Sequence, residues 1–307
     1  MALDLRPLTL AELLDRSFST YKRHLWLFVG IMAVPASLAV VYSAIMQVLQ
    51  FALGIQQQPD PDAKPEQILI TMVPVFISAI LFLIVYMVIY AFALGATTIA
   101  VAHLYKDRTV SVGEAYREVR RHGWRLILLL LWASLRVGGA WIGLIFVGAV
   151  IGGVLTALVP ILGGIFLALV FLCAFIVAGY LSVRYGVSVP AVVLENRTAG
   201  QALSRSVQLT EDHRGRVFLL ILCAIVITYA TAALLQGPFM MGAVFAGPGT
   251  TTALVLSLTG AVLGAIGGMF SGPLMIIGLA MIYYDLRIRK EALDLQMMLE
   301  ALDTPRA

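Results

Sequence analysis

Six long apolar stretches restrict the folds that this chain can adopt. We place them near residues 25–50, 68–95, 125–155, 161–184, 216–236 and 252–282. An α-helix needs about 20 residues to cross the roughly 30 Å of hydrocarbon in a bilayer. Only 12% of the chain is charged, whereas a soluble domain is about a quarter charged. The sequence therefore predicts an all-α, polytopic membrane bundle with six transmembrane helices. The run from Ile68 to Tyr105 can be read as one long helix or as a span followed by an interfacial piece.

The placement of Lys and Arg predicts the orientation of these spans. Of 21 such residues, Lys64 lies in the first loop between spans and Arg136 lies inside a span. The others lie at the N-terminus, around 106–125, around 184–216, or after Tyr284. Because loops rich in Lys and Arg stay in the cytoplasm, we expect both termini to be cytoplasmic.

Three short polar stretches precede three of the spans and resemble one another. Each begins with a capping box, in which a Ser or Thr is followed three residues later by Glu or Gln. The pairs are Thr9 with Glu12, Ser111 with Glu114 and Thr198 with Gln201, and the aromatic residues that follow at the membrane edge are Trp26, Trp124 and Phe218. We predict three repeats, each an interfacial amphipathic helix followed by two spans. The alternative is that cytoplasmic loops before spans look alike without being repeats.

We expect a single integral membrane domain over residues 1–307. Residues 1–24 would form a cytoplasmic amphipathic helix, and residues 285–307 a cytoplasmic helical tail. Ile288, Ala292, Leu295, Leu299 and Leu302 form one apolar stripe on that tail. The stripe predicts docking on the bundle or the membrane surface, or else a coiled coil with a protein partner or a second copy.

The triplet His213-Arg214-Gly215 is also found where the catalytic domain of glycerophosphodiester phosphodiesterases begins. That domain is a soluble β/α barrel of about 250 residues. The chain has no soluble stretch of such length and no acidic metal cluster after the triplet. It also has no Walker loop, H-E-x-x-H, G-x-S-x-G or zinc-type cysteine pair. We therefore expect no catalytic residues, no metal site, no cofactor and no enzymatic activity.

Two stretches resemble a known family. They are YLSVRYGVSVPAVVLENRTAGQALSRSVQLT at 180–210 and YYDLRIRKEALDL at 283–295, and they resemble the membrane-domain family found fused to glycerophosphodiester phosphodiesterases. The matching residues are Arg184, Pro190, Glu195, Ala202, Arg205, Ser206, Tyr284, Asp285, Leu286, Arg287, Arg289, Lys290 and Glu291. The resemblance implies a multi-pass protein of a prokaryotic plasma membrane, in a standalone copy that lacks the hydrolase. A fused partner's chemistry does not transfer with this likeness.

Arg136 is the most unusual residue of the predicted spans. It lies about 18 Å further along a helix than Trp124, near the middle of a bilayer, where an unpaired cation is costly. One interpretation is a site that faces an anionic lipid, a substrate or a water-filled path. The other is that the helix begins deeper in the cytoplasm, so that Arg136 extends to the headgroups or donates to carbonyl groups near Gly138.

The remaining candidates are charged residues near the ends of the predicted spans. We expect an ion pair between Arg184 and Asp285, with Glu195 as a competing partner. The candidate contacts for anionic lipids are Arg136, Arg120, Arg121, Arg125, Arg287, Arg289 and Lys290. Glycines at small-xxx-small spacing, such as Gly139 with Gly143 and Gly148 with Gly152, predict close helix packing.

These observations favour a non-enzymatic membrane protein over a catalyst. Its basic cytoplasmic face would contact anionic lipid headgroups, and the protein would serve as a membrane component of a larger assembly. The alternative is a transporter of a lipid or a small anion with Arg136 in the path. The expected partners are membrane lipids, together with a protein partner or a second copy at the C-terminal helix, and no nucleic acid.

Overall fold

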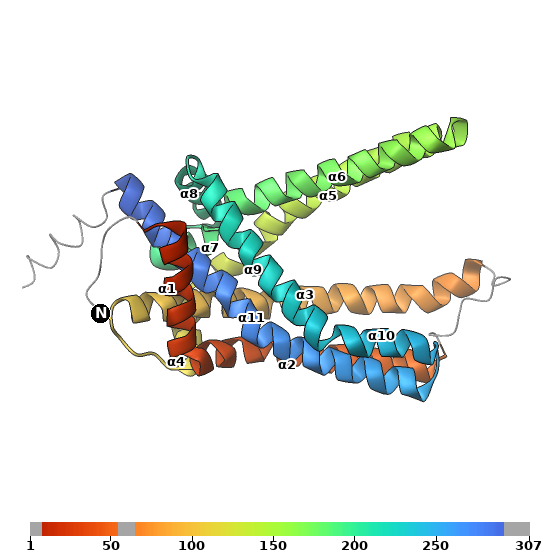
Figure 1. Cartoon of the computed structure of the whole chain (residues 1–307), viewed down its shortest axis with the longest axis horizontal. Helices are drawn as coiled ribbons and strands as arrows, with labels where there is room; N and C mark the ends of the chain where they lie inside the picture. The colour runs from red at the N-terminus through yellow and green to blue at the C-terminus, as the bar shows by residue number, and fades with distance from the viewer. Residues whose placement is uncertain (1–7, 55–64, 292–307) are drawn as a thin grey trace, which may run out of the picture. The chain divides into compact units, whose positions relative to one another are not determined.

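The structure is a computed structural model that describes residues 8–54 and 65–291. The long helices are α2 (Leu25–Ala52), α3 (Pro65–Tyr105), α5 (Gly123–Leu158), α6 (Pro160–Tyr185), α9 (Arg214–Leu235) and α11 (Thr251–Glu291) (Figure 1). Six helices of the described chain are long and apolar enough to cross a membrane. The prediction of an all-α, six-span membrane protein is confirmed. The run from Ile68 to Tyr105 belongs to one continuous helix, α3.

The short helices stand where the three capping boxes predict them. They are α1 (Leu10–Arg23), α4 (Val112–Val119) and α8 (Ala199–Thr210). The backbone N–H of Thr9 donates to Glu12 at 2.7 Å, that of Ser111 to Glu114 at 2.8 Å, and that of Thr198 to Gln201 at 3.2 Å. Because each of these helices precedes two spans, the order of helix, span, span occurs three times along the chain.

Two further short helices are additions to the predicted repeat. The helix α7 (Ser188–Leu194) follows α6, and α10 (Gly237–Ala246) follows α9. The sequence of α7 is as apolar as the span before it, so periodicity alone does not separate the two. The predicted tail at 285–307 begins inside α11, which continues to Glu291. Residues 292–307, with the rest of the apolar stripe, lie outside the described residues.

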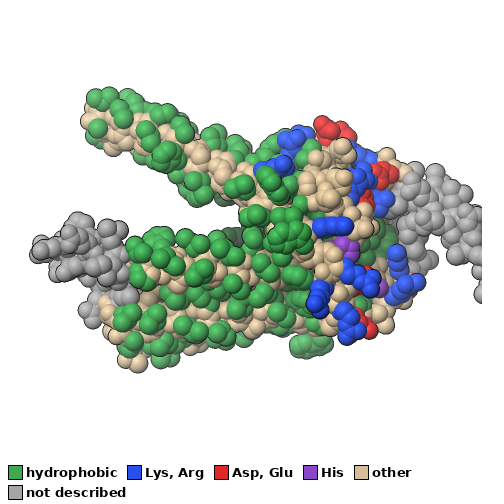
Figure 2. All heavy atoms as spheres, turned by 180° about the vertical axis from the view of Figure 1, so that it is seen from behind, with side chains coloured by type: hydrophobic (Ala, Val, Ile, Leu, Met, Phe, Trp, Pro, Cys, Tyr) green, Lys and Arg blue, Asp and Glu red, His purple; other side chains and the backbone are tan. Residues whose placement is uncertain are grey.

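The chain divides into two compact units, each assembled from separate segments. Unit 1 comprises Met1–Leu13, Arg121–Ile221 and Leu279–Ala307, and unit 2 comprises Leu14–Arg120 and Leu222–Gly278. Figure 2 shows hydrophobic side chains along the length of the spans, and in each unit the charged side chains gather at one end of the helices, the polar end of that unit.

Unit 2 packs long helices with aromatic and glycine contacts. The rings of Tyr42 in α2 and Phe82 in α3 stack with centroids 3.8 Å apart. The Tyr116 hydroxyl of α4 donates to the carbonyl of Ile31 in α2 at 2.8 Å. A Cβ added at Gly260 would lie 3.2 Å from Phe239 Cβ. The amphipathic helix α4 is therefore fixed to α2 by a direct hydrogen bond.

The core of unit 1 contains an antiparallel hairpin of α5 and α6, which turns at Val159 and Pro160. Pro160 occupies the first turn of α6, where a missing N–H costs nothing. A Cβ added at Gly148 would lie 2.2 Å from Val170 Cγ1, and one at Gly152 would lie 2.4 Å from Leu167 Cδ2. The glycine spacing here is a packing device, as predicted. Around Gly139 and Gly143, by contrast, a Cβ would meet nothing within 4 Å.

Candidate functional site at the polar end of unit 1

The last turns of α11 present charged side chains to two different clusters. Residues spaced by four lie on one face of a helix, so Tyr283, Arg287 and Glu291 share one face, and Asp285 shares another with Arg289. The first face meets the Glu195 cluster and the second meets the Asp285 cluster, both within unit 1. These residues belong to the described part of the motif, residues 283–291, which therefore packs the polar end of unit 1.

The Glu195 cluster joins α7, α8 and α11. The side chain of Glu195 is 11% exposed and pairs with Arg205 at 3.1 Å and with Arg197 at 2.8 Å. It also accepts a hydrogen bond from the Tyr283 hydroxyl and lies 3.5 Å from Arg287. Burial opposes the charged form of Glu195, but these hydrogen bonds outweigh it and lower the pKa of Glu195 below its usual value. The carboxylate is thus ionised and satisfied by protein donors.

The Asp285 cluster holds the beginning of the described chain. Asp285 is 2% exposed, and its Oδ1 accepts the backbone N–H of Leu8 at 2.8 Å. Its carboxylate pairs with Arg216 at 3.2 Å and with Arg289 at 2.9 Å. The same two arginines donate to the carbonyl oxygen of Leu8 at 2.7 and 2.6 Å. Both polar groups of the Leu8 backbone are therefore bound by charged side chains.

Asp285 thus has other partners than the predicted Arg184. The Arg184 Nε is buried and has no hydrogen-bond partner, whereas the carbonyl of Arg184 accepts from the Ser206 hydroxyl at 2.8 Å. Spacing along the chain placed Arg184 and Asp285 at the ends of two spans. It could not show that Arg216 and Arg289 lie closer to the carboxylate.

Several predicted lipid contacts have partners inside the protein. Arg287 pairs with Glu291 at 3.0 Å, and Arg289 pairs with Asp285. Lys290 pairs with Asp212 at 2.7 Å. The other predicted contacts vary: Arg125 donates to the carbonyl of Asn196 at 2.9 Å, and Arg120 and Arg121 are exposed on a 3-10 turn (Arg120–His122). Pairing leaves Arg287, Arg289 and Lys290 less free to bind an external anion.

Arg136 is exposed and has aromatic neighbours in place of a carboxylate. Its guanidinium carbon lies 5.9 Å from the ring centroid of Trp132 and 5.8 Å from that of Tyr185. A cation over an aromatic face is stabilised, although it keeps its full positive charge. No described acidic residue forms an ion pair with Arg136. Its charge therefore stays available to an anion.

The length of the hairpin gives the depth of Arg136 in a membrane. Residues 137–159 are uncharged and cover about 35 Å at roughly 1.5 Å per residue. That length suffices for the hydrocarbon of about 30 Å. The ring of Tyr185 at the end of α6 lies beside Arg136, so the two arms reach the same level. The uncharged chain between Arg136 and the hairpin turn is therefore long enough to cross the hydrocarbon without Arg136.

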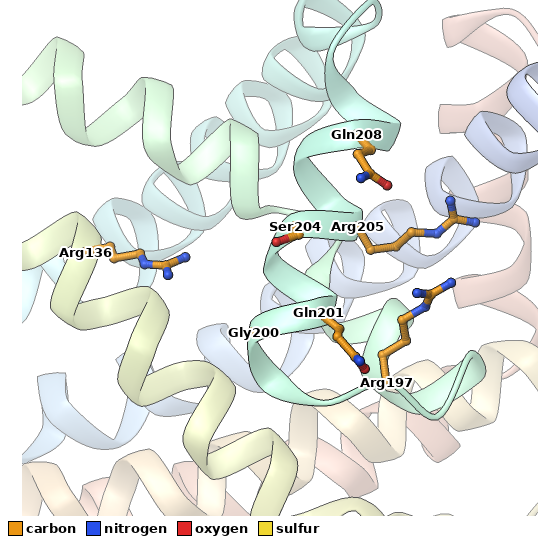
Figure 3. A pocket seen from close by; sticks show the side chains of 7 residues that line it. All are labelled: Arg136, Arg197, Gly200, Gln201, Ser204, Arg205 and Gln208. Atoms are coloured by element: carbon orange, nitrogen blue, oxygen red, sulfur yellow. The ribbon is translucent and has the colours of Figure 1, made fainter.

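An open pocket lies next to Arg136, between α5 and one face of α8. Its volume is about 470 Å³, and its lining consists of Arg136, Arg197, Gly200, Gln201, Ser204, Arg205 and Gln208. Figure 3 shows the Arg136 side chain pointing from α5 toward α8, where Ser204 faces it. The lining offers guanidinium, amide and hydroxyl donors and contains no carboxylate. Such a surface is suited to an anion.

The α8 side of this pocket escaped the sequence interpretation. Gln201, Ser204 and Gln208 are exposed, whereas Ala202 and Leu209 on the opposite face are buried. The spacing of the exposed polar residues by three and four was the available signal. An exposed polar stripe normally faces water, however, and only the packing of α8 beside α5 turns this stripe toward Arg136.

Arg214 is a second cation of unit 1 with an aromatic neighbour. Its guanidinium carbon lies 5.5 Å from the ring centroid of Tyr180, and its Nε is buried without a hydrogen-bond partner. It belongs to the His213-Arg214-Gly215 triplet, which the structure places where α8 ends and α9 begins. Arg136, Arg184 and Arg214 thus share one property: none of them pairs with a carboxylate in the described part of the chain.

The comparisons with known proteins agree with the motifs of the polar end. No curated protein and no solved structure matches the chain. The matched family region contains the Glu195 cluster and all of the Asp285 cluster except Leu8. Residues 161–300 match the protein family described as the membrane domain of glycerophosphoryl diester phosphodiesterase, which confirms the resemblance of the stretches at 180–210 and 283–295.

Proposed function

We propose that this integral membrane protein binds anionic lipids at its polar end, as a non-enzymatic membrane component of a larger assembly. The observation that carries the proposal is a group of three arginines of unit 1, Arg136, Arg184 and Arg214, that pair with no carboxylate among the described residues. Two of them lie over aromatic rings, Arg136 over Trp132 and Tyr185 and Arg214 over Tyr180. Aromatic residues and arginines are enriched where a helix meets the headgroup region.

The family resemblance implies a prokaryotic plasma membrane, and the distribution of charge supports a cytoplasmic location for the polar end. Nearly all Lys and Arg lie at this end of the spans, which is the side that loops rich in these residues occupy. Anionic headgroups attract each nearby Lys or Arg by on the order of 1 kcal/mol. The polar end would therefore collect anionic lipids around the protein.

The position of Arg136 supports lipid contact over the alternative of transport. A transport path needs a polar site near the bilayer midplane. The uncharged length of the hairpin instead favours a position of Arg136 near the edge of the hydrocarbon, beside the polar face of α8. The headgroup region is the part of a bilayer that this arginine can reach.

The proposal is tested by measuring which lipids surround the protein. The full chain is reconstituted in nanodiscs of phosphatidylcholine and phosphatidylglycerol, and the lipids that remain after mild detergent extraction are quantified. We expect phosphatidylglycerol to be enriched over its share in the nanodisc. The enrichment should fall when Arg136, Arg184 and Arg214 are all changed to Ala. Lipids retained in the proportion supplied, by the wild type and the triple variant alike, would contradict the proposal.

A further inference from the structure

We infer that the pocket between α5 and α8 binds one phosphate group, and that Arg136 is its main ligand. The inference rests on the proposed lipid contact and specifies the group that is bound. The phosphate belongs either to a phospholipid headgroup or to a small soluble phosphate ester. Both sources present the same phosphate group to the pocket, and they differ in whether acyl chains are attached.

The charge of the pocket is positive, because only some of its cations are compensated. Arg197 pairs with Glu195, and Arg205 pairs with Glu195 and Glu291. These carboxylates lie outside the lining and already accept from protein donors. Arg136 is the lining arginine without an acidic partner among the described residues. The Arg197 and Arg205 guanidinium groups point away from Arg136 (Figure 3), so an incoming anion would meet one uncompensated guanidinium, that of Arg136.

The donors of the pocket fit phosphate. A guanidinium presents a planar fork that binds two oxygens of a phosphate at once. Ser204 faces Arg136 across the pocket, whereas the Gln201 side chain points away from Arg136 (Figure 3). The Ser204 hydroxyl can therefore donate to a phosphate oxygen that the fork leaves free. The volume of about 470 Å³ lies within the range of sites that bind small molecules.

A lipid source fits the surface of α5 beyond Arg136. Gly139 and Gly143 follow Arg136 at spacings of three and seven, which places them on the same helix face. A Cβ at either glycine would meet nothing within 4 Å. A phosphate bound at Arg136 could thus have an acyl chain lying along this smooth face toward the hairpin turn. A soluble phosphate ester would make no use of it.

The test is native mass spectrometry of the full chain in mild detergent with three probes. These are phosphatidylglycerol, the diacylglycerol with the same acyl chains, and glycerol 3-phosphate. The variants are Arg136→Ala, Arg136→Lys and the control Arg117→Ala. Arg117 is also an exposed arginine, but it lies outside the pocket lining and outside the arginines proposed to bind lipid. Because Arg136 is exposed, its replacement should leave thermal unfolding unchanged, and this is measured for each variant.

We expect the wild type to retain one phosphatidylglycerol and no diacylglycerol. Arg136→Ala should weaken that binding at least about tenfold, the scale of one charge-assisted contact. The affinity of Arg136→Lys for phosphatidylglycerol should lie between those of the wild type and Arg136→Ala, since Lys keeps the charge but lacks the planar guanidinium. Arg117→Ala should bind like the wild type. Equal losses in Arg136→Ala and Arg117→Ala, or no loss in either, would overturn the pocket while leaving general lipid contact intact.

The source of the phosphate is determined from the effect of Gly143→Leu on the binding of phosphatidylglycerol and of glycerol 3-phosphate. If lipid is the source, Gly143→Leu should weaken the binding of phosphatidylglycerol and leave the binding of glycerol 3-phosphate unaffected. If the source is soluble, glycerol 3-phosphate should bind the wild type, lose binding in Arg136→Ala, and be insensitive to Gly143→Leu. A wild type without preference for phosphatidylglycerol over diacylglycerol would defeat the proposed lipid function. The pocket itself would fail if glycerol 3-phosphate did not bind either.

Discussion

The backbone N–H of Leu8 donates to Oδ1 of the buried Asp285 at 2.8 Å. The contact ties the beginning of the described chain to the end of α11. Because Arg216 and Arg289 hold both the carboxylate of Asp285 and the carbonyl of Leu8, the four groups form one closed cluster. Asp285 and Arg289, two charged residues of the 283–295 motif, therefore have a structural role.

Replacing Asp285 should destabilise the protein strongly. Asp285→Asn keeps an acceptor for Leu8 but leaves Arg216 and Arg289 without their negative charge. Removing one partner of a buried pair costs about 3–5 kcal/mol. We expect a lower thermal unfolding midpoint in detergent and faster hydrogen exchange at the Leu8 amide. The control is Asp15→Asn, since Asp15 is exposed and its replacement should change neither quantity. An unchanged midpoint for Asp285→Asn would show that the cluster contributes little.

Two of the three arginines that pair with Glu195 should differ in their importance. The side chain of Arg205 is 14% exposed and that of Arg197 is 43% exposed. Arg205→Ala leaves Glu195 and Glu291 to share Arg287, so we expect a clear loss of stability. Arg197→Ala removes a largely solvated pair, which is worth about 0–1 kcal/mol. Chemical unfolding of both variants in the same detergent gives their free energies of unfolding. Equal decreases in the two variants would contradict the prediction.

Acid should weaken the Glu195 cluster. The folded pKa of Glu195 lies below its ordinary value of 4.5, so folding favours the charged form. The resulting stability is present above about pH 4.5 and is lost as the pH falls through the folded pKa. We expect the unfolding midpoint to drop between pH 6 and pH 3. In Glu195→Gln the midpoint should be lower at pH 6 and should depend less steeply on pH. A slope as steep as that of the wild type would exclude Glu195 as its cause.

Two neighbouring glycines of α6 should respond in opposite ways to the same substitution. A Cβ at Gly163 would lie 2.4 Å from the Cα of Thr156, a backbone atom, whereas one at Gly164 would meet nothing within 4 Å. Gly163→Ala should therefore cost about 1–3 kcal/mol through overpacking of the hairpin. Gly164→Ala should be neutral, or stabilising by up to about 1 kcal/mol, because Ala favours helix. Thermal unfolding of the two variants tests this difference. Similar midpoints would contradict the close approach of Gly163 to Thr156.

Local features of this fold could be predicted from the sequence, and long-range partners could not. The capping boxes at Thr9, Ser111 and Thr198 involve residues three apart, so the chain itself determines them. The partner of Asp285 depends on where Leu8 and Arg216 lie in space, which spacing does not encode. The depth of Arg136 likewise depends on the hairpin turn at Val159, because counting from Trp124 assumed that the membrane begins there.

The depth of Trp132 in a bilayer tests the central claim most directly. Variants that retain only Trp132 or only Trp141 are reconstituted in bilayers with lipids brominated at different acyl positions, and tryptophan quenching is measured. Trp132 lies beside Arg136, so it should be quenched most by the shallowest bromines. Trp141 should lie about 13 Å deeper along α5 if that helix is roughly upright. Strongest quenching of Trp132 by bromines near the bilayer centre would return Arg136 to the middle of the membrane and contradict the account.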